Sequence, residues 1–167
     1  MTESPLYETA LTHVTAAGSA HMVDVSGKEA AARVAVATGT VRTTPEVIAL
    51  LRANGLKKGD ALAVARVAGI MAAKRTSELI PLCHPIAITK VGVDFLLHDD
   101  GEVSIEATVA TTDRTGVEME ALTAVAIAGL TLHDMIKAVD PAAVLGEIKV
   151  ERKEGGKSGL WTRPAGR

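Results

Sequence analysis

The chain has 167 residues, a length that suggests one domain with a sizeable buried core. Its 18 Lys and Arg residues nearly balance 20 Asp and Glu residues, so no strong field draws it to nucleic acid or to an anionic membrane. Aromatic residues make up only 2% of the chain, which excludes the stacking platforms of proteins that bind single-stranded nucleic acid.

A lone cysteine, Cys83, rules out an internal disulfide and fits a reducing compartment. The N-terminus, MTESPLYETA, lacks a basic region followed by an apolar run, so no signal peptide is expected. No stretch reaches about 18 uncharged apolar residues, the length of a membrane span. We therefore expect a cytoplasmic protein with neither a nucleic-acid nor a membrane partner.

The first half of the chain predicts one strand and two helices. Residues 1–18 are expected to be flexible, the segment 20–26 could form a short strand, and the alternation over 32–43 predicts a longer strand. A helix is expected to start with Thr44 as its N-cap, followed by Pro45, and to stop at Asn54-Gly55. A second helix is expected from Ala61 to about Leu79, before Pro81.

The second half predicts a hairpin, a long helix and a last strand. Strands over 87–98 and 102–112 flank a turn at 99–102, which indicates an antiparallel hairpin. A helix is expected from Val117 to about Val139, then a strand over 144–152 and a flexible tail, 153–167. This order indicates one α+β domain with a ferredoxin-like (split βαβ) antiparallel sheet. Its helices pack on one face, and an extra helix lies in the first crossover.

Three charged residues of the long helix are candidates for acid–base chemistry. Asp134 and Lys137 lie three residues apart and share one face, and Glu120 lies about four turns earlier within roughly 40° of the same stripe. A solvated ion pair at the helix end is one interpretation, and an acid and a base held in one cleft is the other.

Lys58 has two interpretations as well. It stands just before Gly59-Asp60, at the start of the second expected helix. It is either a solvated turn lysine or an ammonium directed at a phosphate near the helix N-terminus. The phosphate-loop pattern GxxxxGK[ST] is absent from the chain.

The segment LIPLCHPI (79–86) sets Cys83 beside His84 between two prolines. Neighbouring side chains of an extended segment point to opposite sides, so the two are poorly placed to pair as nucleophile and base. One cysteine and scattered histidines show no metal-ligand spacing, so no metal site is expected. An extended, stiff backbone between the prolines suits a substrate-binding edge, whereas the alternative is a connector with a buried cysteine.

Several long strings resemble the cyclic pyranopterin monophosphate synthase family, the protein C family of molybdenum cofactor biosynthesis. They are HMVDVSGK (21–28), KGD (58–60), ARVAGIMAAKRTSELIPLCHP (65–85), TGVEMEALTA (115–124), HDMIKAVD (133–140) and GGKSG (155–159), and the resemblance covers roughly residues 11–160. It implies a lyase that converts 3′,8-cyclo-7,8-dihydro-GTP to cyclic pyranopterin monophosphate and releases pyrophosphate.

Position by position, the resemblance assigns the catalytic acid–base role to Asp134 and the key lysine roles to Lys58 and Lys137. It implies substrate binding by Leu82, Cys83, His84, Met119 and Glu120, with Lys28 and Lys157 as weaker candidates for phosphate contacts. It further implies a homohexamer, a trimer of dimers, with active sites between subunits. No cofactor is implied, although Mg²⁺ could accompany the triphosphate.

Two rival functions stay open at this point. One is a thiol hydrolase or transferase that uses Cys83, which fast alkylation of the thiol near neutral pH would favour. The other is a non-catalytic nucleotide-binding domain with the same fold. Release of pyrophosphate from the cyclised GTP separates that domain from the enzyme.

Overall fold

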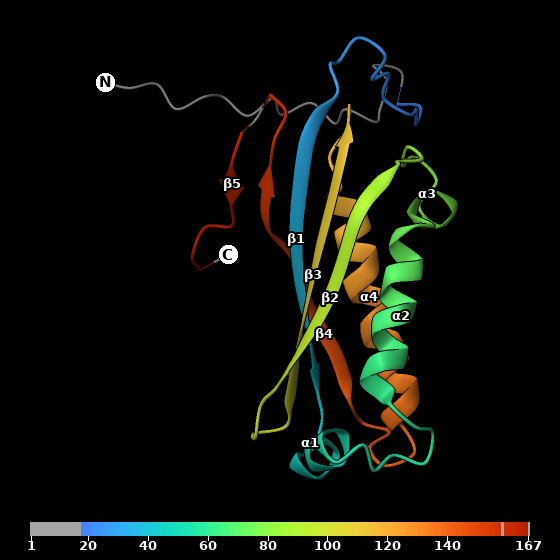
Figure 1. Ribbon diagram of the computed structural model, residues 1–167, viewed down its shortest axis with the longest axis vertical. Coiled ribbons are helices and arrows are strands. Elements are labelled where there is room, and N and C mark those ends of the chain that lie inside the picture. Colours follow the sequence, from blue (N-terminus) through green and yellow to red (C-terminus); the bar gives the residue numbers. More distant parts are fainter. Residues whose placement is uncertain (1–17, 158, 167) are drawn as a thin grey trace.

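The computed structural model describes residues 18–157 and 159–166, so the prediction of flexibility for residues 1–17 lies outside the described residues. Along the chain the elements are β1 (Ala31–Arg42), α1 (Pro45–Arg52), α2 (Ala61–Ala73), α3 (Thr76–Leu79), β2 (Ile88–Leu97), β3 (Glu102–Asp113), α4 (Glu118–Ile136), β4 (Val144–Glu154) and β5 (Trp161–Thr162) (Figure 1). The four longer predicted strands and the first and long helices are confirmed to within three residues at their ends.

The strands form one sheet in the order β2-β3-β1-β4-β5, and every neighbouring pair is antiparallel. Helices α2 and α4 lie side by side on one face of this sheet, and α1 lies across one end (Figure 1). The α+β ferredoxin-like prediction is confirmed, including the additional helix in the crossover from β1 to β2. Strand β5 was not predicted. It pairs with the end of β4, within the segment 153–167 that was expected to be flexible.

The core lies between the sheet and the two long helices. Alternate side chains of the central strands β1 and β3 are fully buried there: Ala35, Ala37, Val41, Val103, Ile105, Ala107 and Val109. The helices approach closely at Gly69 of α2, where a Cβ atom would lie only 2.8 Å from the Ala124 carbonyl oxygen of α4. This close contact determines how α4, which carries the candidate residues at both its ends, sits against α2.

In the described part of the chain, α4 alone is long and apolar enough to cross a membrane by length and composition. More than half of its most apolar window, 56%, is buried within the fold. Ten of its residues are buried, which is how the core helix of a layered domain behaves.

Two sequence predictions are wrong. The expected single helix over 61–79 is divided, because Arg75 leaves the helical conformation and the buried Thr76 hydroxyl donates to the Ala73 carbonyl oxygen at 3.0 Å. The short strand expected over 20–26 is reduced to an isolated bridge at Ala20 followed by a loop, in which the Asp24 carboxylate accepts from the Ser26 backbone N–H at 2.8 Å. Such local side-chain bonds compete with regular secondary structure.

Candidate functional site

The predicted site residues form two groups at opposite ends of α4, which runs from near α3 to near α1 (Figure 1). Glu120 lies in the first turn and Asp134 in the last, fourteen residues apart. At 1.5 Å per residue this separation is about 21 Å along the helix axis. Within a single chain Glu120 and Asp134 therefore do not share a cleft, whereas Asp134 and Lys137 do lie together.

The first group is a lysine–aspartate cluster of Lys58, Asp134 and Lys137. The Lys58 Nζ atom donates to Asp134 Oδ2 at 2.9 Å and to the Asp134 backbone oxygen at 2.8 Å, while Lys137 Nζ lies 2.7 Å from Oδ1. The hydrogen bond from Lys137, then that from Lys58, lowers the pKa of Asp134 to about 2. Asp134 is therefore ionised near neutral pH in this chain, and it can accept a proton but has none to donate.

The loop before α2 brings Lys58 to this cluster. Gly59 has a positive φ of 92°, which glycine adopts without strain, and its N–H donates to the Leu56 oxygen at 3.0 Å. The next residue, Asp60, caps α2 by accepting from the Ala63 N–H at 2.9 Å. Lys58 thus forms an ion pair with Asp134 of α4, whereas the side chain of Asp60 caps the N-terminus of α2.

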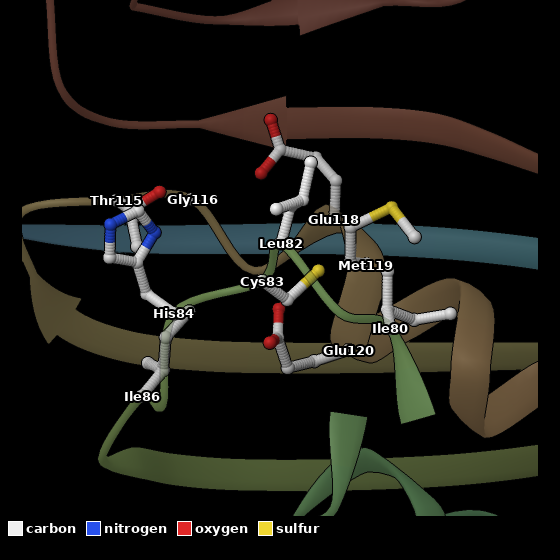
Figure 2. Close-up of a pocket in the computed structure, with 10 residues that line it drawn as sticks. All are labelled: Ile80, Leu82, Cys83, His84, Ile86, Thr115, Gly116, Glu118, Met119 and Glu120. Carbon is white, nitrogen blue, oxygen red and sulfur yellow. The ribbon is translucent and has the colours of Figure 1, made fainter. Parts of the chain in front are cut away.

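The second group lines a cavity of about 460 Å³, here called the α4 N-terminal pocket (Figure 2). Its walls come from the loop over 80–86 and from the start of α4: Ile80, Leu82, Cys83, His84, Ile86, Thr115, Gly116, Glu118, Met119 and Glu120. All five residues that the resemblance implies for substrate binding are among them. The fold thus brings together two segments, 80–86 and 115–120, that are separated in the sequence by β2 and β3.

The loop itself differs from the prediction of a fully extended segment. The Cys83 N–H donates to the Ile80 oxygen at 3.1 Å, which closes a turn with Pro81 at its second position. His84 Nε2 lies 2.8 Å from the Val23 oxygen, and Figure 2 shows the imidazole pointing away from the thiol. The prediction that Cys83 and His84 do not pair agrees with this geometry.

Glu120 is the unusual member of the pocket. It is only 3% exposed, and its Oε2 atom is buried without a hydrogen-bond partner among the described residues. Burial raises the pKa of Glu120 to about 7. The charge of Glu118 adds to this shift, and a hydrogen bond from Glu120's own backbone opposes it. Near neutral pH a large share of this carboxyl group is therefore neutral.

Cys83 lines the same pocket as Glu120 (Figure 2). Burial raises the pKa of Cys83, and the charge of Glu120 raises it further. A protonated thiol is a poor nucleophile, which argues against the rival function built on Cys83. Among residues 18–157 and 159–166, no three His, Cys, Asp or Glu side chains gather closely enough to hold a metal ion.

A cationic pocket of about 600 Å³ holds the remaining predicted residues, Lys28 and Lys157. Its lining also includes Arg33, which the sequence analysis missed. Arg33 is held in place because its Nε and Nη2 atoms donate to the carbonyl oxygens of Asp113 (2.9 Å) and Arg114 (3.1 Å). Read locally, Arg33 is an ordinary strand residue. Only the pairing of β1 with the end of β3 reveals its place.

The two pockets are neighbours, joined by a cavity of about 50 Å³ that touches residues of both. An ion pair stands at this junction, with Lys153 Nζ of β4 3.1 Å from Glu118 Oε1 of α4. Neither residue was singled out from the sequence, because the pair depends on how β4 lies beside α4. One end of the sheet thus combines a partly apolar pocket with a cationic one.

Comparison with known proteins identifies the family of this chain. The model of the MoaC family matches residues 22–156. A cyclic pyranopterin monophosphate synthase of Nocardioides sp. is 64% identical over 156 residues, covering 92% of this chain and 96% of its own length. The synthase of Streptomyces coelicolor is 61% identical over 92% of this chain and 89% of its own length. The cyclic pyranopterin monophosphate synthase 2 of Mycobacterium tuberculosis is 61% identical, covering 92% and 91%. The chain therefore belongs to the MoaC family.

Proposed function

We propose that this chain is a lyase that converts 3′,8-cyclo-7,8-dihydro-GTP to cyclic pyranopterin monophosphate and releases pyrophosphate, as a step of molybdenum cofactor biosynthesis. Relatives named cyclic pyranopterin monophosphate synthase support this reaction, because they match nearly the whole chain at about 60% identity. One structural observation carries the proposal: a pocket with a buried carboxyl group adjoins a cationic pocket. That pairing suits a ligand with a heterocycle at one end and phosphates at the other.

In this proposal the phosphates occupy the cationic pocket, near Lys28, Arg33 and Lys157. A triphosphate carries about four negative charges near pH 7, and a chain with a net charge of −2 must gather its cations locally to hold it. Cations that bind the departing pyrophosphate stabilise the charge that develops on it. The proposal includes no resident cofactor, and Mg²⁺, where present, enters with the triphosphate.

The lysine–aspartate cluster supplies the proton chemistry in this proposal. Asp134 orients the ammonium groups of Lys58 and Lys137 and, being ionised, can accept a proton from the substrate. The ammonium groups can donate protons in turn. In the isolated chain the cluster faces solvent, so it becomes part of a closed site only when something covers it.

That cover is a second copy of the chain, because one chain holds the cluster and the pocket about 21 Å apart along α4. We propose the homohexamer, a trimer of dimers, in which the cluster of one subunit meets the pocket of another. Exposed apolar side chains on the outer surface of α2 and on α4 support such contacts: Val64, Val67, Met71 and Leu130. A cytoplasmic location belongs to the same proposal, supported by the single, unpaired cysteine.

The direct test is to incubate the purified protein with 3′,8-cyclo-7,8-dihydro-GTP, with and without EDTA, and to measure pyrophosphate and the pterin product. We expect one pyrophosphate per cyclic pyranopterin monophosphate formed. Tight binding of the substrate without release of pyrophosphate would identify the non-catalytic nucleotide-binding domain instead.

The shared site is tested by mixing Asp134→Asn with Glu120→Ala, each first shown to lack turnover by itself, after dissociation and reassembly. In a two-fold dimer, half of the mixed pairs combine the variants, and each such pair has one of its two sites intact. About one quarter of wild-type turnover should therefore return. Recovery of none, with mixed assemblies present, would show that each site is built within one subunit.

A further inference from the structure

The starting observation is the unpartnered carboxyl group in the α4 N-terminal pocket. In the described part of the chain, Glu120 Oε2 is the one buried side-chain oxygen or nitrogen without a hydrogen bond. Leaving a buried charged oxygen unpartnered is costly, whereas a neutral carboxyl group is much cheaper to bury. The protein groups around Glu120 therefore favour its protonated form, and a ligand that supplies hydrogen bonds changes that balance.

The groups around Glu120 reinforce this state. From its own helix, Glu118 presents a negative charge, which is turned toward Lys153 of β4 by their ion pair. From the facing loop come Cys83, whose thiol is protonated, and His84, whose ring nitrogen is bound to a backbone oxygen. No described cation forms an ion pair with Glu120, so the hydrogen bond from its own backbone is the one described contact that favours its negative charge.

The protonation state of Glu120 determines which ligand edge it can bind. A carboxylate only accepts, so it matches two adjacent N–H donors, such as the ring N–H and the exocyclic amino group of guanine. A neutral carboxyl group has one donor and one acceptor, so it matches a lactam edge, in which a carbonyl oxygen adjoins a ring N–H. A guanine-derived heterocycle carries both edges. The paired N–H donors require Glu120 to be ionised, whereas the lactam edge requires it to be protonated.

We propose that Glu120 binds the paired N–H donors of the heterocycle as a carboxylate, and that the proton it carries in the empty pocket passes to water when the ligand binds. The proposal rests on the proposed function, which supplies the guanine-derived ligand. The O–H bond of Glu120 breaks, its proton goes to solvent, and two N–H···O hydrogen bonds form while the ligand keeps its covalent structure. A pKa of about 7 makes this release inexpensive near neutral pH.

The test uses guanosine, which lacks titrating phosphates, and the wild-type assembly in isothermal calorimetry. Comparing buffers with different ionisation enthalpies counts the protons released on binding. A pKa of about 7 predicts about three quarters of a proton released near pH 6.5 and almost none near pH 8.5. Inosine, which lacks the amino donor, should bind about 10-fold or more weakly, because it leaves a carboxylate oxygen unpaired.

Variants assign the proton to Glu120. Glu120→Gln keeps the shape but has no proton to lose, so guanosine binding should release none and its affinity should not change between about pH 6 and 8.5. The matched control is Glu78→Gln, which changes an exposed carboxylate outside the pocket and should release protons as the wild type does. Release that persists in Glu120→Gln would overturn the proposal.

The wild-type data alone can also contradict the proposal, whatever the variants do. Guanosine that binds without releasing a proton near pH 6.5, together with equal affinity for inosine, would show that a neutral Glu120 binds the lactam edge. Failure of this inference is separable from failure of the proposed function, because pyrophosphate release is measured independently of the proton count.

Discussion

The two ends of α4 present carboxylates in opposite circumstances. Asp134 is half exposed and held by two ammonium groups, and its pKa falls to about 2. Glu120 is buried, has an unpartnered oxygen, and its pKa rises to about 7. The pKa values of two similar side chains on one helix thus differ because Asp134 is paired with two ammonium groups, whereas Glu120 is buried.

This difference in charge suits the two ends of α4 to different functional roles. The lysine–aspartate cluster carries permanent charges that need no partner to form, so it suits proton transfer and charge stabilisation once the substrate arrives. The α4 N-terminal pocket carries a carboxyl group whose charge depends on what binds, so it suits recognition. Neither end contains both features, which is the physical reason for proposing a site shared between copies.

The largest expected effect comes from removing the charge at the exposed end. Asp134→Asn should lower turnover by about 100-fold or more, because an amide neither accepts the substrate proton nor holds both ammonium groups. Steady-state release of pyrophosphate measures it. The control is Asp99→Asn, which removes a similar exposed ion-pair partner, that of Arg52, and should leave turnover near normal. Near-normal turnover of folded Asp134→Asn would contradict the role given to Asp134.

An intermediate effect is expected on stability at the buried end. The pKa of Glu120 is raised from its usual value of 4.5 to about 7, so its stabilising contribution is complete below about pH 4.5 and is lost as the pH rises through about 7. Relative to wild type, Glu120→Gln should therefore gain on the order of a few °C in Tm between about pH 5 and pH 8.

Thermal unfolding at several pH values measures this difference. Asp134 adds no pH dependence to the stability between about pH 5 and pH 8. Because its pKa is lowered, its stabilising contribution is present above about pH 4 and is lost only as the pH falls through about 2. Asp134→Asn therefore serves as the matched control, with a Tm difference from wild type that stays constant. A constant difference for Glu120→Gln would mean that Glu120 is ionised throughout.

The smallest effect is expected at Cys83. Its raised pKa predicts alkylation by iodoacetamide near pH 7 that is slower than that of a free thiol, and Glu120→Gln should speed labelling by about 2-fold, since a neighbouring negative charge is removed. Cys83→Ser should retain most of the turnover. Fast labelling, loss of turnover and a covalent adduct on Cys83 would together revive the thiol mechanism.

Much of the fold followed from local patterns. The Thr44 cap and Pro45 marked the start of α1, and the Thr44 hydroxyl does accept from the Val47 N–H at 3.3 Å. The turn at 99–102 joined the hairpin of β2 and β3 as expected. These features depend on a few residues that are neighbours in the sequence, so they can be predicted from the sequence alone. The break before Thr76 depends on one side-chain hydrogen bond and was missed.

The candidate site divided in the same way. The resemblance named five of the ten residues that line the α4 N-terminal pocket and all three of the lysine–aspartate cluster, and the spacing of Asp134 and Lys137 predicted their shared face. Arg33 and the Glu118–Lys153 pair could not be found from the sequence, because each depends on strand pairing or on the docking of β4 beside α4. Whether these residues act on substrate stays a prediction.

The sequence by itself determined the order of the elements, the family, and which titratable residues the chain carries. The tertiary structure decided how those residues are charged and which of them meet. It buried Glu120 without a partner and surrounded Asp134 with two ammonium groups, a difference in solvation that no residue spacing encodes. The distance between the two groups, in contrast, followed from the sequence, since a helix keeps residues fourteen positions apart about 21 Å from each other.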